Sequence, residues 1–171
     1  MPRLVLDLND PKDREVVKGS WRLGRGYVPG EPNQGLVAEL KSVDARLKDF
    51  DDSGWEEWPD VRQGLSSGFT FAWYRIKVEL PATARGVDVS GMRVFFETNA
   101  DNYGELWIDG QIDAALGVII GNNVTRRVEL TSEIGPGTSH TIAVLVANGP
   151  LAEPRGGVFL RYAYLAFESP N

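Results

Sequence analysis

Residues 103–110 read Tyr-Gly-Glu-Leu-Trp-Ile-Asp-Gly. In this stretch Leu106 and Ile108 alternate with polar or aromatic neighbours, a period of two that predicts a β-strand with one face in a core. The strand is followed at once by Asp109 and Gly110. These two residue types tolerate the positive φ angles of a type I′ turn. We therefore expect a strand and a tight hairpin here.

The neighbouring sequence extends this pattern into a sheet. Residues 92–97 predict another strand, and the polar residues 99–102 a loop between the two. The longest alternating run, residues 71–80, ends at Pro81, which cannot donate to a sheet ladder. Further strands are expected at residues 3–8, 16–23, 36–40, 127–130, 140–147 and 158–168.

Strands at this spacing, with no convincing amphipathic helix, predict an all-β fold, an antiparallel two-sheet β-sandwich. The alternation also predicts which side chains face its core. The expected core residues are Tyr74, Ile76, Val78, Val94, Phe96, Leu106, Ile108, Ile142, Val144 and Val146.

Composition limits the classes of function. A chain of 171 residues suggests one domain over residues 1–171. The net charge of −6 and the absence of any basic run longer than Arg126-Arg127 argue against a nucleic acid or an anionic membrane as partner. There are no cysteines, no recognisable signal peptide and no apolar run long enough to span a membrane. We expect a cytoplasmic protein, unless the chain is an excised domain.

Several kinds of active site have no support in the sequence. His140 is the only histidine, and no Gly-x-Ser-x-Gly motif is present, so neither a zinc site nor a Ser-His-Asp triad is indicated. Paired carboxylates such as Asp101 and Glu105 could in principle hydrolyse a glycoside, but the sequence gives no distance between them. No catalytic residue is therefore assigned, and we lean towards a protein that is not an enzyme.

Aromatic and polar residues lie side by side at several places. Sugars present apolar C–H faces ringed by hydroxyls, and their sites combine a flat aromatic ring with polar side chains. The alternative for Trp73 and Arg75 is that they merely cover the outside of the sheet. The predicted ligand-binding residues are Asp101, Asn102, Tyr103, Trp73 and Arg75, with Asn122 and Arg155 as outer candidates.

Three motifs strengthen the sugar hypothesis. Residues 49–55 (Asp-Phe-Asp-Asp-Ser-Gly-Trp), residues 73–81 (Trp-Tyr-Arg through Leu-Pro) and residues 105–110 resemble the sugar-binding domain of glycoside hydrolase family 2 in order and spacing. Asp109 stands where that family usually has Asn. The resemblance covers residues 45–147. Residues 115–117, 122–123 and 147–151 resemble a module attached to gluconolactonase-like proteins.

The resemblance implies a galactose-binding-like jelly roll whose catalytic acids belong to a separate barrel domain. We therefore expect a non-catalytic carbohydrate-binding module, free-standing or accessory to a sugar-active enzyme. Two alternatives stay open. One is a structural subunit that binds a protein partner or forms a homo-oligomer, and the other is a small enzyme acting on a sugar or sugar lactone.

The resemblance also implies a possible structural calcium ion, although no cofactor is required. The candidate ligands are Asp49, Asp51, Asp52 and Glu168. The aspartates equally suit an Asx-type turn, in which a carboxylate accepts a backbone N–H hydrogen bond. The ligand spacing of a calcium-binding loop is absent.

Overall fold

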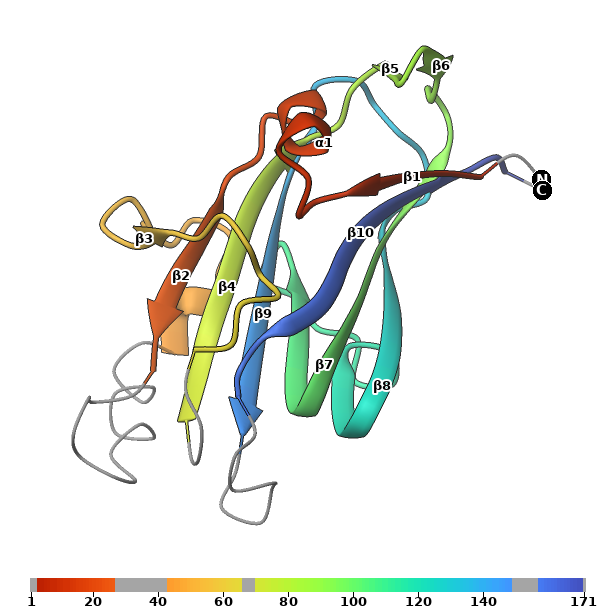
Figure 1. Cartoon of the computed structure of the whole chain (residues 1–171). Coiled ribbons are helices and arrows are strands. Elements are labelled where there is room, and N and C mark those ends of the chain that lie inside the picture. Colours follow the sequence, from red (N-terminus) through yellow and green to blue (C-terminus); the bar gives the residue numbers. More distant parts are fainter. Residues whose placement is uncertain (1–2, 27–42, 66–69, 149–156, 171) are drawn as a thin grey trace.

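The structure is a computed structural model, and it describes residues 3–26, 43–65, 70–148 and 157–170. Ten strands and two short helices account for most of this part (Figure 1). The strands are β1 (Arg3–Asp7), β2 (Trp21–Arg25), β3 (Glu56–Glu57), β4 (Thr70–Glu79), β5 (Thr83–Ala84), β6 (Val87–Asp88), β7 (Arg93–Ile108), β8 (Val118–Thr131), β9 (Ser139–Asn148) and β10 (Leu160–Glu168). The helices are α1 (Pro11–Val16) and the 3₁₀-helix η1 (Val43–Arg46).

The fold is an all-β sandwich made from one large, curled antiparallel sheet. Its strand order is β1-β10-β7-β9-β4-β2-β3, with β8 also paired to β7, while β5 and β6 form a small separate sheet. The long strand β7 changes partner along its length, since residues 93–100 pair with β10 and residues 103–108 pair with β9. Strand β7 therefore joins two layers of the sheet. One layer contains β1 and β10, and it crosses over the other layer, which contains β4 and β9 (Figure 1).

The core lies between these two layers. All ten residues that the alternation assigned to it are buried, and they belong to one apolar cluster. Leu106 is 0% exposed. The fold class and the core predicted from the period of two are therefore confirmed.

The predicted hairpin after β7 is also confirmed. Asp109 and Gly110 have φ angles of +50° and +79°. On either side of them, the backbone N–H of Ile108 donates to the Gln111 carbonyl at 2.8 Å, and the N–H of Gln111 donates to the Ile108 carbonyl at 2.9 Å. A two-residue turn with both φ angles positive matches the twist of antiparallel strands.

The predicted loop at residues 99–102 is wrong, because these residues continue β7 without a break. The irregularity lies in the facing strand instead. Ala100 pairs with Val124 and Asn102 with Gly121, so β8 uses three steps where β7 uses two. Asn123 adopts a φ of +60° at this β-bulge. Asparagine tolerates that conformation, so the polar residues form a bulge rather than a loop.

The predicted strand at residues 16–23 begins only at Trp21. Its first residues belong instead to the end of α1 and the turn after it. Asp10 is the N-cap of α1, and its carboxylate accepts the Lys12 N–H at 2.9 Å. Pro11 at the first helical position has the fixed φ that a helix start requires. The predicted strand at residues 36–40 lies outside the described residues, and none of the helices described is long and apolar enough to cross a membrane.

Candidate functional site

Trp73 and Arg75 lie on the face of β4 that points away from the main core, as predicted, but they are not exposed. Their exposures are 3% and 1%. Residues 43–55, which we call the strap, cross over this face. Within the strap, Ala45 packs with Trp73 and with Ala143 of β9 in a second, smaller apolar cluster. The sandwich therefore has a covered outer face.

Arg75 holds the strap in place. Its Nε donates to the Asp52 carboxylate at 2.8 Å, and its Nη1 donates to the Leu47 carbonyl at 3.0 Å and to the Ala45 carbonyl. Its guanidinium also lies over the Phe50 ring, at 5.3 Å from the centroid. Because the guanidinium is buried and donates into the strap, Arg75 has a structural role, and this geometry does not place it against a ligand.

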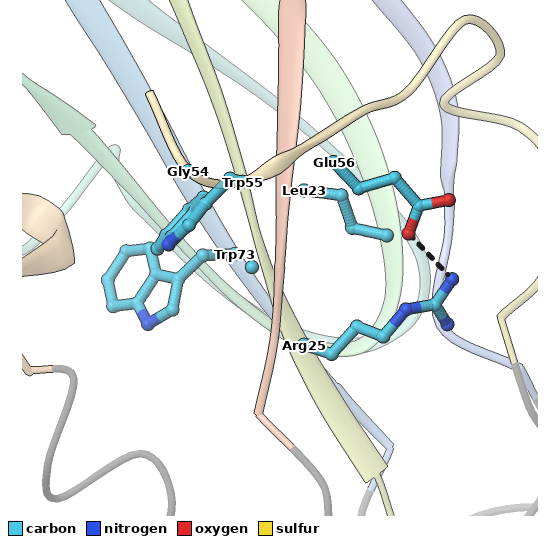
Figure 2. A pocket seen from close by; sticks show the side chains of 7 residues that line it. Leu23, Arg25, Gly54, Trp55, Glu56 and Trp73 are labelled. Carbon is cyan, nitrogen blue, oxygen red and sulfur yellow. Dashed lines mark hydrogen bonds and ion pairs between the residues drawn. The ribbon is translucent and has the colours of Figure 1, made fainter. Parts of the chain in front are cut away.

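A pocket of about 340 Å³ opens beside the strap, at the edge of β2 (Figure 2). Its lining residues are Leu23, Gly24, Arg25, Gly54, Trp55, Glu56 and Trp73. Figure 2 shows the indoles of Trp55 and Trp73 on one side of β2 and the side chains of Arg25 and Glu56 on the other. The pocket thus combines an aromatic wall with a charged wall.

The aromatic wall depends on a glycine. A Cβ atom added to Gly24 would lie 2.5 Å from the Trp55 ring, so the indole packs directly on the backbone of β2. On the strap side, Trp55 contacts Phe50, with ring centroids 5.2 Å apart and an angle of 58° between the rings. Trp55, the last residue of the strap, is therefore packed between the backbone of β2 and the Phe50 ring, and part of its surface stays exposed.

The charged wall is an ion pair at the mouth of the pocket. The Arg25 guanidinium donates to the Glu56 carboxylate at 3.1 Å, and the side chains are 35% and 53% exposed. The guanidinium also lies over the Trp58 ring, 5.4 Å from its centroid. Both charged groups stay accessible to solvent, so both can form hydrogen bonds to a ligand in the pocket.

Tyr103 lies on the same outer face as Trp73 but in a different strand. Strand β9 lies between them, because Trp73 pairs with Leu145 and Leu145 pairs with Glu105. The Tyr103 hydroxyl donates to Glu105 Oε1 at 2.6 Å, and Trp107 Nε1 donates to Oε2 at 2.9 Å. Burial and the Glu105 carboxylate raise the pKa of Tyr103 to about 12. Both Glu105 oxygens thus accept hydrogen bonds from within the sheet.

The other predicted ligand residues are not gathered at one place. For Asp101 and Asn102 the structure describes the backbone, which lies in β7. Asn122 is exposed at the bulge of β8, and Arg155 lies outside the described residues. Among the predicted residues whose side chains the structure describes, only Trp73 lines the pocket at β2.

Four residues that line this pocket were not predicted from the sequence: Gly24, Arg25, Trp55 and Glu56. Trp55 was visible as the aromatic that closes the Asp-rich turn. Its placement over Gly24 depends on the path of the strap, however, and no local pattern shows that path. The Arg25–Glu56 pair likewise forms only after β2 and β3 come together.

Three of the four predicted calcium ligands have separate partners. Asp51 accepts the Ser53 N–H at 3.0 Å, the Asx turn expected from its sequence, and Asp52 accepts from Arg75. Glu168 forms an ion pair at 2.6 Å with Arg127 of β8, while Asp49 is exposed at the turn. Within the described residues, no group of three or more His, Cys, Asp or Glu is arranged to hold a metal ion. Calcium binding stays a prediction without a described ligand set.

Asp109 connects the hairpin to the strap. Its carboxylate accepts the Thr141 N–H at 2.8 Å, lies 2.8 Å from His140 Nδ1, and forms an ion pair with Lys48 at 3.2 Å. Burial by itself would raise the pKa of Asp109, but the hydrogen bonds from Thr141, His140 and Lys48 outweigh it and lower the pKa. His140 thus belongs to a cluster of hydrogen-bonded and charged groups that joins β9, the hairpin and the strap.

Comparison with solved structures relates this architecture to known enzymes. A beta-glucuronidase from Bacteroides uniformis matches 97% of the chain at a TM-score of 0.63 and 20% identity. A glycosyl hydrolase family 2 member from Bacteroides cellulosilyticus matches 97% at a TM-score of 0.64 and 14% identity. A Faecalibacterium prausnitzii beta-glucuronidase matches 97% at a TM-score of 0.60 and 15% identity.

The chain has the fold of a glycoside hydrolase family 2 domain. It spans only 18%, 21% and 31% of the three matched chains, so the fold is shared with a part of each enzyme. For the fold, these matches confirm the resemblance to glycoside hydrolase family 2 that the motifs at residues 49–55, 73–81 and 105–110 predicted. No protein-family model matches the chain. A search of curated proteins finds no relative.

Proposed function

We propose that this chain is a non-catalytic carbohydrate-binding domain that acts together with a sugar-active enzyme. The observation that supports it is the pocket at β2, which is lined by the partly exposed indole of Trp55 and, across β2, by the Arg25–Glu56 pair. An indole offers a flat apolar surface for the C–H face of a sugar ring. The guanidinium donates and the carboxylate accepts, which suits hydroxyl groups that do both.

The size of the pocket supports a sugar rather than a larger ligand. Small-molecule sites are concave and measure about 300–1,000 Å³, and this pocket of about 340 Å³ lies at the lower end. Its two charged groups form a pair, so they leave no net charge for a neutral sugar to compensate.

The comparisons support the part of the proposal that this domain acts together with a sugar-active enzyme. Two of the three matched structures are named as beta-glucuronidases and one as a glycosyl hydrolase family 2 member, and this chain corresponds to at most 31% of each. A domain of this fold in such an enzyme can deliver or orient the substrate while other residues carry out the hydrolysis. Tyr103, with Asp101 and Asn102 in the same strand, remains a proposed second contact for a ligand that extends over the outer face.

Isothermal titration calorimetry tests the proposal. Galactose, glucuronic acid and β-linked oligosaccharides of each would be titrated into the wild-type chain and into Trp55→Ala. Loss of the stacking surface should weaken binding at least tenfold, which is about 1.4 kcal/mol. Tyr164→Ala is the matched control, because Tyr164 is a half-buried tyrosine of β10 that does not line the pocket. Equal affinity of Trp55→Ala and wild type would exclude this pocket as the site.

A protein-binding role is the second candidate, and one surface favours it. Within the described part of the chain β8 pairs only with β7, so its other edge is open. Ile120 on this strand is 70% exposed and Leu116 just before it is 52% exposed. Open edges with apolar side chains pair readily with other strands. Light scattering of the wild type and of Ile120→Lys would show a dimer that the substitution dissociates if this role holds.

A further inference from the structure

The pocket at β2 contains one positive and one negative side chain. Among the described residues that line it, only Arg25 and Glu56 are charged (Figure 2). They form an ion pair at 3.1 Å, and their side chains are 35% and 53% exposed, so both can be reached by a ligand. The lining therefore carries no net charge, although it contains a guanidinium.

The fold keeps Glu56 beside Arg25. In the antiparallel pairing of β2 with β3, Glu56 lies opposite Leu23, and Arg25 is two residues further along the same face of β2. Diagonal neighbours of this kind lie within reach of long side chains. The Arg25 guanidinium also lies over the ring of Trp58, which is 7% exposed. Because β3 is paired to β2, the Glu56 carboxylate stays close to the guanidinium when a ligand enters the pocket.

The surroundings of the pocket are acidic. The strap, which supplies Trp55 to the lining, also carries Asp49 and Asp51, and both are exposed. Within the described residues, neither aspartate forms an ion pair with a lysine or an arginine. The whole chain has a net charge of −6. A negatively charged ligand would therefore be attracted by Arg25 but repelled by Glu56 and by these two aspartates.

A sugar acid differs from its parent sugar by one charged group. In galacturonic and glucuronic acid a carboxyl group replaces the C6 hydroxymethyl group, and it is ionised at neutral pH. A sugar hydroxyl can accept from Arg25 and donate to Glu56, whereas an ionised carboxylate can only accept. In this pocket it would also lie near the negative charge of Glu56. Repulsion between like charges is one way in which binding sites reject a closely related ligand.

We infer that Glu56 determines the class of sugar that this pocket binds, because it excludes sugar acids and leaves neutral sugars as ligands. The inference rests on the proposed carbohydrate-binding function and adds the charge of the ligand to it. Arg25 supplies the hydrogen-bond donors, and Glu56 both accepts from a neutral sugar and offsets the charge of Arg25. The neighbouring Glu57 has no such role, since it pairs with Arg22 at 3.2 Å and does not line the pocket.

A charge series at residue 56 tests the inference. Wild type, Glu56→Gln and Glu56→Lys would be titrated calorimetrically with galactose, glucose, their C6 acids and β-linked oligosaccharides of each, at neutral pH and low ionic strength. Glutamine keeps the size and an acceptor oxygen of glutamate and removes the charge. Glu57→Gln and Glu57→Lys are the matched controls, because they change the charge of the whole chain by the same amount at the other residue of β3.

The expected result is a change of selectivity at residue 56 alone. Wild type should bind each neutral sugar at least about fivefold more tightly than the corresponding acid. Glu56→Gln should bind the acids at least about tenfold more tightly than wild type does, while its affinity for neutral sugars stays within about threefold. Glu56→Lys should bind the acids more tightly still, and added salt should reduce both gains because it screens charges. The Glu57 variants should bind every sugar like wild type.

Three results would overturn the inference while the proposed function stands. They are equal affinity of wild type for a sugar and its acid, no gain for the acids in the Glu56 variants, and an equal gain in the Glu57 variants. If no sugar, neutral or acidic, binds to wild type or to any variant, the proposed function itself is wrong and the inference fails with it. Melting curves identify a variant that does not fold, and the other member of the charge series then decides the matter.

Discussion

Substitution of Arg75 by alanine should detach the strap from the sheet. Arg75 is 1% exposed and donates to the Asp52 carboxylate and to the carbonyls of Ala45 and Leu47. Removing it leaves one carboxylate and several carbonyls under the strap without their donor, and it leaves a cavity. Because Arg75 is buried but the Asp52 side chain is 31% exposed, the loss of unfolding free energy should be about 3 kcal/mol, the lower end of the range for removing one partner of a buried ion pair. For a chain of this length, each kcal/mol corresponds to about 2–4 °C, so the melting temperature should fall by about 6–12 °C.

Urea unfolding at neutral pH, followed by tryptophan fluorescence, measures this effect. Arg62→Ala is the matched control, because the Arg62 side chain is 56% exposed and forms a surface ion pair with Asp60. Such pairs contribute about 0–1 kcal/mol. Since the strap also carries Trp55, Arg75→Ala should weaken sugar binding as well. A loss below about 1 kcal/mol, similar to that of Arg62→Ala, would refute the view that Arg75 holds the strap.

Three further predictions concern the core, the hairpin and the pocket. Leu106→Ala, at a position with 0% exposure, should cost about 2–5 kcal/mol in the same urea assay, and a loss below about 1 kcal/mol would mean that Leu106 is not in the core. The pKa of Asp109 is lowered in the folded chain, so its carboxylate stabilises the fold above about pH 4 and the effect is lost as the pH falls through the folded-state pKa. Asp109→Asn should therefore reduce the unfolding free energy at neutral pH, with a difference from wild type that disappears in acid; a constant difference at all pH values would contradict this. Gly24→Ala places a Cβ 2.5 Å from the Trp55 ring and should weaken sugar binding in calorimetry, whereas Gly64→Ala, with nothing within 4 Å of its added Cβ, should bind like wild type.

The sequence was sufficient for the parts of the fold that depend on local alternation. The period of two around Leu106 and along residues 71–80 identified two central strands and their buried faces, and Asp109-Gly110 identified the turn between β7 and Gln111. The break expected at residues 99–102 was not found. Polar residues predict a departure from regular pairing, but they do not show which of two paired strands contains the extra residue.

The site was harder to predict because it depends on a contact between distant segments. Trp73 and Arg75 were correctly placed on the outer face of β4, yet nothing local showed that residues 43–55 would cover them. That cover buries Arg75 and turns a predicted ligand contact into a structural one. The same crossing brings Trp55 onto Gly24 and forms the pocket. The residue types that favour sugar binding were recognised, but their grouping required the tertiary structure.

The most direct test of the account is a crystal structure of the chain soaked with the oligosaccharide that binds best in calorimetry. The account predicts a sugar ring against Trp55 in the pocket at β2, with hydroxyl groups within hydrogen-bond distance of Arg25 and Glu56. A sugar bound elsewhere on the sandwich, with the pocket at Trp55 unchanged, would contradict it.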